Sequence, residues 1–156
     1  VTGLLLYIRK TKLPFMGVLD SLGIAAPIFS AMVRLGNLMN SEIIGLPTEM
    51  PWGFVFVKTG ITAPCHPAQL YESLAYFAVF IAIIILYRKH KEKVGTGLYA
   101  GFTLFTIFTF RFFVEYIKDN QVAFEDGMLL NMGQILSIPL VIAGGYLIYR
   151  STRNKA

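Results

Sequence analysis

The sequence predicts an all-α integral membrane protein, a polytopic bundle of transmembrane helices, and three observations support this. The chain has 156 residues, 55% of them hydrophobic, and its mean hydropathy of +0.60 is high for a soluble domain of this size. Apolar segments long enough to cross a bilayer recur along it. Basic residues gather in short runs between those segments, a pattern typical of the cytoplasmic loops of membrane proteins.

The apolar segments define the expected elements in order. Residues 1–8 are apolar but shorter than the roughly 20 residues of a spanning helix, so we expect them to end a helix that starts upstream. Four fuller segments follow, at 15–33, 68–87, 96–116 and 132–149. Each is long enough to cross, or nearly cross, the hydrocarbon layer as a helix. The prediction is one transmembrane domain over 1–156, with four full spans and a truncated N-terminal one.

Three basic clusters orient these spans, because they fall at every second membrane exit. They are Arg9, Lys10 and Lys12; Arg88, Lys89, Lys91 and Lys93; and Arg150, Arg153 and Lys155. The positive-inside rule assigns such exits, and with them the C-terminus, to the cytoplasm. The other connections, 34–67 and 118–131, carry both signs of charge. We expect them to be outer loops on the periplasmic side.

Composition excludes several classes of site and partner. The net charge of +5 could suggest nucleic acid, but the positions of the basic residues favour a membrane protein. The single cysteine, Cys65, excludes an internal disulfide framework and a multi-cysteine metal site. Two distant histidines make zinc unlikely to bind, and glycine-rich phosphate loops and metalloprotease motifs are absent from the sequence. We therefore expect no metal, no cofactor and no nucleic-acid partner.

Strongly polar residues gather near the predicted outer ends of the spans. They are Arg34, Asn37, Asn40, Glu42, His66, Gln69, Glu72, Arg111, Glu115 and Gln134. A charge at membrane depth costs about 3 kcal/mol, so each needs a partner or a purpose. The exception is Asp20, near the inner edge, for which we expect pairing with Arg9, Lys10 or Lys12.

Each of these groups has a structural interpretation beside a functional one. Arg111 and Glu115 lie four residues apart on one helix face, so they form either an ion pair that locks helices together or part of a site. Arg34 with its asparagines either lines an anionic headgroup site or ends a helix at interfacial water. His66 either caps a turn or takes part in the site. Its neighbour Cys65 is disfavoured as a nucleophile paired with it, because adjacent side chains rarely face each other.

Four motifs occur in one order along the chain: "VRLGNLMNSEIIGLPT" at 33–48, "HPAQLYES" at 66–73, "FRFFVEYIKDNQ" at 110–121 and "MGQILSIP" at 132–139. In this the chain resembles the prolipoprotein diacylglyceryl transferases, which are integral proteins of the bacterial cytoplasmic membrane. Val33 and Lys118 depart from the glycine and arginine usual in that family. The family's histidine-glycine-glycine motif, with a candidate catalytic base, would lie before Val1, so the chain resembles the C-terminal portion and this fragment alone is expected to be inactive.

The resemblance implies residue roles at the matching positions. It implies catalytic roles for Arg34, Arg111 and Glu115, and binding of phosphatidylglycerol by Arg34, Asn37, Glu42, Gly45 and Arg111. Glu42 and Glu115 are expected to orient the two guanidinium groups. The resemblance also implies supporting roles for further residues of these motifs, namely Asn40, His66, Gln69, Tyr71, Glu72 and Gln134.

The implied reaction transfers the diacylglyceryl group of phosphatidylglycerol to the lipobox cysteine of a prolipoprotein and releases glycerol phosphate. The implied partners are this lipid and the prolipoprotein signal segment, met at the outer leaflet. Two alternatives stay open: a non-catalytic lipid-binding or scaffold protein of the same fold, and a transporter fragment in which Arg111, Glu115 and Glu72 line a solute path. No inverted repeat supports the transporter.

Overall fold

The computed structural model describes residues 2–118 and 130–153. It contains five α-helices: α1 (Thr2–Thr11), α2 (Phe15–Asn40), α3 (Ala68–Lys89), α4 (Leu98–Val114) and α5 (Met132–Arg153). Single 3₁₀ turns lie at Val57–Thr59, Lys91–Lys93 and Glu115–Ile117. Within the described residues, β structure is limited to isolated bridges. The all-α prediction is confirmed.

Four of the described helical stretches are long and apolar enough to cross a membrane: Phe15–Asn40, Ala68–Lys89, Leu98–Ile117 and Met132–Arg153. This confirms a multi-pass membrane protein. The predicted end of the first span at residue 33 was wrong, since α2 continues to Asn40. It stops where Ser41 adopts a left-handed conformation (φ 59°) and donates its N–H to the carbonyls of the last turn. The connecting segment is therefore 41–67, not 34–67.

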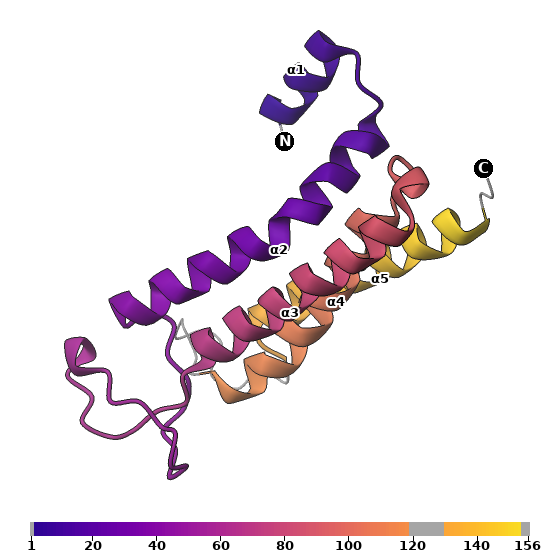
Figure 1. Ribbon diagram of the computed structural model, residues 1–156. Helices are drawn as coiled ribbons and strands as arrows, with labels where there is room; N and C mark the ends of the chain where they lie inside the picture. Colours follow the sequence, from indigo (N-terminus) through magenta and orange to yellow (C-terminus); the bar gives the residue numbers. More distant parts are fainter. Residues whose placement is uncertain (1, 119–129, 154–156) are drawn as a thin grey trace.

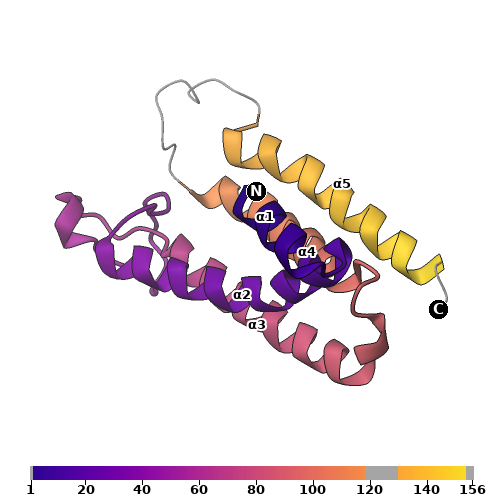
Figure 2. The ribbon, with the colours of Figure 1, turned by 90° about the horizontal axis from the view of Figure 1, so that it is seen from above.

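Helices α2 to α5 lie side by side, whereas α1 diverges from α3, α4 and α5 (Figure 1). Seen from above, α4 lies between α5 on one side and the pair α2 and α3 on the other (Figure 2). Two apolar clusters fill the interior of the bundle. They are Ala31, Tyr76 and Ile107, and Ile83, Leu98 and Tyr99.

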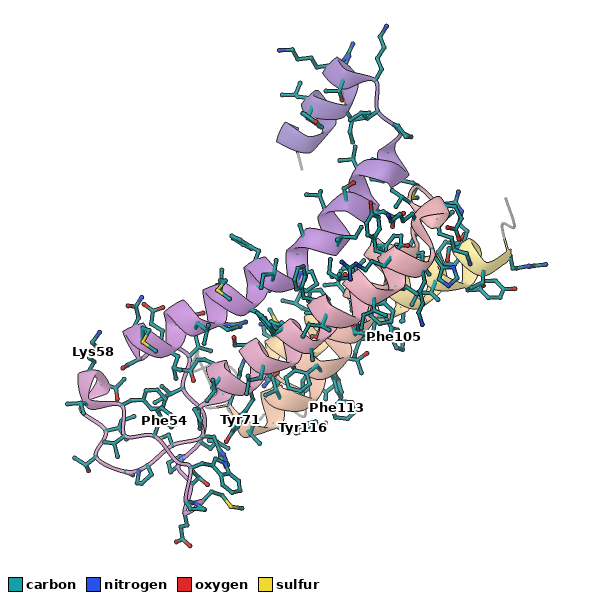
Figure 3. All side chains as sticks on the ribbon, in the orientation of Figure 1. Phe54, Lys58, Tyr71, Phe105, Phe113 and Tyr116 are labelled. Atoms are coloured by element: carbon teal, nitrogen blue, oxygen red, sulfur yellow. The ribbon has the colours of Figure 1, made fainter. Side chains whose placement is uncertain are left out.

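The two ends of the bundle differ in the residues they carry. The connection between α3 and α4, the turn between α1 and α2, and the end of α5 lie at one end (Figure 1). The described residues of the three basic clusters belong to these segments, so we name it the basic end. Segment 41–67 lies at the other, which we name the loop end. Figure 3 places Phe54 and Lys58 of this segment there, and Lys58 Nζ donates to the carbonyl of Met39 at 3.1 Å.

A buried carboxylate organises the basic end. Asp20 of α2 is fully buried and accepts three backbone N–H groups: Gly95 at 2.8 Å, Gly97 at 2.9 Å and Ala100 at 3.0 Å. These donors lie at and just before the start of α4, where the helix leaves N–H groups unpaired and the helix dipole favours an anion. The expected pairing of Asp20 with Arg9, Lys10 or Lys12 was therefore wrong, because backbone donors satisfy both of its oxygens.

Glycines set the helix spacing near this end. A Cβ on Gly23 would lie 2.7 Å from the backbone of Ala100, and one on Gly101 would lie 2.9 Å from the carbonyl oxygen of Gly144. These contacts hold α2 and α5 tightly against α4. Pro27 cannot donate to the carbonyl of Gly23, four residues earlier, and the hydroxyl of Thr103 donates to it instead at 2.7 Å. Polar groups at this end thus find partners within the bundle.

Candidate functional site

At the loop end, Arg34 pairs with a carboxylate on the neighbouring helix. Its Nε lies 3.1 Å from Oε2 of Glu72, and the side chain of Glu72 is fully buried. Arg34 sits in the second-last turn of α2, and Glu72 in the second turn of α3, so the pair joins the end of one helix to the start of the next. We expected Glu42 to orient Arg34, but Glu72 holds that position.

Glu72 has two further partners. The same oxygen lies 3.1 Å from Nζ of Lys118, whose side chain is only 1% exposed, and its other oxygen accepts the Tyr76 hydroxyl at 3.0 Å. Lys118 also lies 3.5 Å from Glu115. Glu115 in turn packs against Gly133 of α5, where a side chain would overlap its carboxylate. A continuous charge cluster, Arg34, Glu72, Lys118 and Glu115, therefore joins α2, α3 and the residues after α4.

Beside this cluster a cavity of about 400 Å³ opens between α2, α3 and α4. Its polar lining comes from Ser30, Arg34, Asn37, Tyr76 and Arg111. The apolar lining residues are Phe29, Val33, Ile43, Ile107 and Phe108. Because Phe29 is 71% exposed on α2, the cavity reaches the apolar outer surface of the bundle. It combines two guanidinium groups with an opening toward the membrane.

Arg111 is the second cation of the cavity. The expected ion pair with Glu115 does not form, because Glu115 pairs with Lys118 instead. Among the described residues, Arg111 has no hydrogen-bond or ion-pair partner. The ion pair of Arg111 with Glu115, predicted as the structural alternative, is therefore absent from the described part of the chain, and a half-buried guanidinium without a carboxylate is expensive in an apolar layer.

Asn37 lines the same cavity. Its Nδ2 donates to Oε2 of Glu42 at 2.9 Å, which fixes the amide orientation because a carboxylate only accepts. Its Oδ1 is buried without a hydrogen-bond partner in the described part of the chain. Glu42 itself is exposed at the rim. Asn37 thus lines the cavity and carries a buried carbonyl oxygen that is unsatisfied within the described residues.

The chain turns sharply at the rim. Gln69, fully buried in the first turn of α3, donates to the backbone carbonyl of Glu42 at 2.5 Å. The next residue, Ile43, has φ 58°, a conformation rarely adopted by a β-branched side chain, and it lines the cavity. Such strain persists where the surrounding structure enforces it. Gln69 therefore supports the turn that follows α2.

Gly45 has a backbone role. Its N–H donates to the carbonyl of His66 at 3.0 Å, and Leu46 donates to Ile117 at 2.9 Å, so segment 41–67 is held between the chain before α3 and the chain after α4. A Cβ on Gly45 would lie 2.6 Å from the His66 oxygen and 2.8 Å from that of Ile117. Only glycine fits there. Gly45 does not line the cavity.

The remaining predicted residues lie outside the cavity lining. His66 Nδ1 lies 3.3 Å from the hydroxyl of Tyr71, which accepts from Trp52 Nε1 at 2.9 Å. Gln134 and Asn131 exchange hydrogen bonds in a capping box at the start of α5. Asn40 is exposed at the end of α2. Figure 3 shows Tyr71 at the loop end, on the side of segment 41–67.

Comparison with protein families shows the family of this chain. The model of the family described as prolipoprotein diacylglyceryl transferase matches residues 1–150. The chain belongs to this family. The phosphatidylglycerol-prolipoprotein diacylglyceryl transferase of Bacteroides fragilis is 49% identical over 156 residues, which cover 100% of this chain and 56% of the relative.

Other transferases of the family give the same result. The protein of the same name from Tolumonas auensis is 44% identical over 142 residues, covering 91% of this chain and 54% of the relative. The protein of that name from Porphyromonas gingivalis is 43% identical over 159 aligned positions, covering 94% of this chain and 56% of the relative. The chain thus spans about half the length of the curated relatives that it matches.

The described parts of the four sequence motifs lie at the loop end of the bundle. The first and third motifs supply Arg34, Asn37 and Arg111 to the cavity, while the second supplies Glu72 behind its wall. Sequence reasoning missed Lys118, which counted as a loop charge, and Tyr76. Both were detectable in part, since Tyr76 follows Glu72 by one helical turn and Lys118 follows Glu115 by three residues.

The described residues include no group of three or more His, Cys, Asp or Glu side chains that could hold a metal ion. Cys65 is 1% exposed and its thiol donates to the carbonyl of Ala63 at 3.5 Å. The chemical capacity of the site thus resides in its guanidinium groups, suited to a phosphate at the edge of an apolar layer.

Proposed function

We propose that this protein transfers the diacylglyceryl group of phosphatidylglycerol to the lipobox cysteine of a prolipoprotein, forming a thioether and releasing glycerol phosphate. The observation that carries the proposal is the cavity with Arg34 and Arg111 in a chain of the transferase family. The names of the relatives support both substrates, since each names phosphatidylglycerol and prolipoprotein.

The proposed reaction is a displacement at carbon. The cysteine sulfur attacks the glycerol carbon that carries the phosphate, an S–C bond forms, and the C–O bond breaks. The electron pair of the broken bond leaves with the phosphate oxygen, and the thiol proton is released. Negative charge therefore moves from sulfur to the leaving phosphate, so the protein gains most by stabilising that phosphate as the charge arrives.

Arg34 and Arg111 are suited to this task. Arg34 meets Glu72 through Nε and also lines the cavity, so in this proposal its terminal nitrogens bind the phosphate. Arg111 lines the same cavity from α4. Guanidinium groups stay charged and bind phosphate through paired donors, and in a site with little water such contacts lower a barrier by about 3 kcal/mol each when they tighten in the transition state.

Asn37 supports recognition of the lipid headgroup. Its unsatisfied Oδ1 accepts hydrogen bonds, and the glycerol hydroxyls of phosphatidylglycerol donate them. A buried acceptor that stays unpaired costs about 1–3 kcal/mol, so a headgroup with a hydroxyl at this position is favoured over one without it. This gives Asn37 a role in choosing the lipid.

The positive charge of Arg34 and Arg111 also favours the thiolate form of the acceptor cysteine. A free thiol has a pKa near 8.5, and nearby positive charge raises its ionised fraction at neutral pH. The lipid donor enters through the opening beside Phe29, and the acceptor arrives through its own membrane-embedded signal segment. In this proposal the protein lies in the bacterial cytoplasmic membrane, with the loop end toward the outer leaflet and the C-terminus in the cytoplasm.

The test uses the full-length protein as the cell makes it, purified in detergent with phosphatidylglycerol and a lipobox peptide. Released glycerol phosphate is measured with the cysteine peptide and with a matched peptide in which serine replaces that cysteine. We expect release only with the cysteine peptide, together with a thioether-linked product. A folded protein that binds the lipid but releases nothing would contradict the proposal and favour a non-catalytic lipid-binding protein.

A further inference from the structure

Glu72 is the most connected charged residue of the loop end, yet the proposed reaction does not use it. It lies behind the cavity wall and is fully buried. Its carboxylate joins Arg34 and Lys118 at 3.1 Å each and accepts the Tyr76 hydroxyl at 3.0 Å. An ion pair this deep gives little net stability compared with apolar packing. Its role is therefore better sought in the charge of the site.

The charges of the described residues around the cavity do not cancel. Among the described residues, the cations are Arg34, Arg111 and Lys118, and the carboxylates are Glu72 and Glu115. One positive charge is left over. Glu42 lies at the exposed rim, where water screens its carboxylate.

We propose that Glu72 is a specificity-determining residue that sets the cavity to a single positive charge, which matches a monoanionic phosphodiester and disfavours a dianionic phosphate monoester. The inference rests on the proposed function. It assigns Glu72 a second, positioning role, because its contact with Nε directs the terminal nitrogens of Arg34 to the cavity.

The two anions stand on opposite sides of the reaction. The lipid donor is a phosphodiester with one negative charge. The product, glycerol phosphate, is a monoester whose second pKa is about 6, so it carries nearly two charges above neutral pH. With the donor bound the site is neutral, and with the product bound it is negative. Glu72 therefore favours loading of the donor and release of the product.

The test measures the binding of two soluble anions to the full-length protein in detergent at pH 8. Glycerophosphoglycerol is the phosphodiester headgroup without acyl chains, and glycerol phosphate is the monoester. Calorimetry gives both dissociation constants, and their ratio is the readout. A loosened site would weaken both anions alike and leave the ratio unchanged, whereas a change of site charge alters the ratio.

Two variants shift the charge in opposite directions. In Glu72→Gln the site gains one positive charge, and we expect the preference for the monoester over the diester to rise about tenfold, the order expected for one charge in a partly buried site. In Lys118→Gln the preference should fall by a similar factor. If one of these two variants fails to fold, the ratio measured for the other still tests the proposal. An unchanged ratio in either folded variant would overturn the proposal.

Glu92→Gln is the matched control. Glu92 lies in the exposed turn Lys91–Lys93 at the basic end. Its pKa is lowered, chiefly by a hydrogen bond from its own backbone amide, so it is ionised at pH 8. The ratio of the two dissociation constants in Glu92→Gln should equal that of the wild type. Release of glycerol phosphate is measured in the same preparations. If the wild type releases none, the proposed function is contradicted. The ratio of the two dissociation constants tests the role of Glu72 separately.

Discussion

The two ends of the helix bundle both bury charge, but they use it differently. At the basic end, Asp20 accepts three backbone N–H groups and both of its oxygens are occupied. At the loop end, Arg111 has no such partner among the described residues, and Oδ1 of Asn37 is buried and unsatisfied. A cavity adjoins the second group. Among the described residues, the polar groups are thus fully paired at the basic end and incompletely paired beside the cavity at the loop end.

This difference separates folding from function. Buried polar groups that satisfy one another raise stability and hold helices in register. Groups that face a cavity with bonds still to make cost stability and are retained where a ligand completes them. By this criterion Asp20 belongs to the fold, and Arg34, Asn37 and Arg111 belong to the site. Substitutions at the two ends are therefore expected to change different measured quantities.

The largest expected change in stability is at Asp20. Asp20→Ala removes the acceptor of three N–H groups near the start of α4, and we expect a loss of about 3 kcal/mol in unfolding free energy. Asp20→Asn keeps one oxygen and should lose about half as much. Thermal unfolding in detergent measures both. An unchanged midpoint in Asp20→Ala would remove the contrast between the two ends.

A smaller loss is expected where helices touch closely. Gly101→Ala places a methyl group 2.8 Å from Cβ of Leu147 and 2.9 Å from the Gly144 oxygen, so α4 and α5 must separate, at a cost of about 2 kcal/mol. Gly36→Ala is the control, because a Cβ there meets nothing within 4 Å and alanine favours helix by about 1 kcal/mol. If the thermal unfolding midpoints of Gly101→Ala and Gly36→Ala fall equally, close helix contact at Gly101 does not explain the loss of stability.

The smallest of these effects concerns the shape of the charge at the loop end. Arg111→Lys keeps the positive charge but loses the planar pair of donors, so turnover is expected to fall about tenfold with an unchanged unfolding midpoint. Arg150→Lys makes the same exchange at an exposed position of the basic end and should leave turnover unaltered. Normal turnover in Arg111→Lys would count against bidentate hydrogen bonding of the phosphate by Arg111.

Hydropathy and motif order predicted much of this molecule. The four spans followed from apolar length, and the grouping of polar residues at one end followed from where they fall along those spans. The outcome for Asp20 could not be foreseen, because its partners are backbone donors of residues 95–100, far along the chain. Sequence patterns identify charged side chains near one another, but they do not show which helix start lacks an acceptor.

The pairing within the candidate site was likewise hidden. Glu115 precedes Lys118 by three residues and follows Arg111 by four, so spacing alone permits either pair. The structure chooses Lys118 because the helix tightens into the turn Glu115–Ile117 and carries Lys118 inward to Glu72. Which arginine stays available for a ligand therefore depends on a local change in helix geometry that the motif does not encode.

The measurement that tests this account most directly is glycerol phosphate release by the full-length wild type, Arg34→Ala and Arg111→Ala. The thermal unfolding midpoint of each protein is measured first, to show that it is folded. The account predicts cysteine-dependent release in the wild type, and loss of release in both variants with Arg111→Ala keeping the wild-type midpoint. Release that persists in either variant would contradict the assignment of the cavity as the place where the phosphate is held.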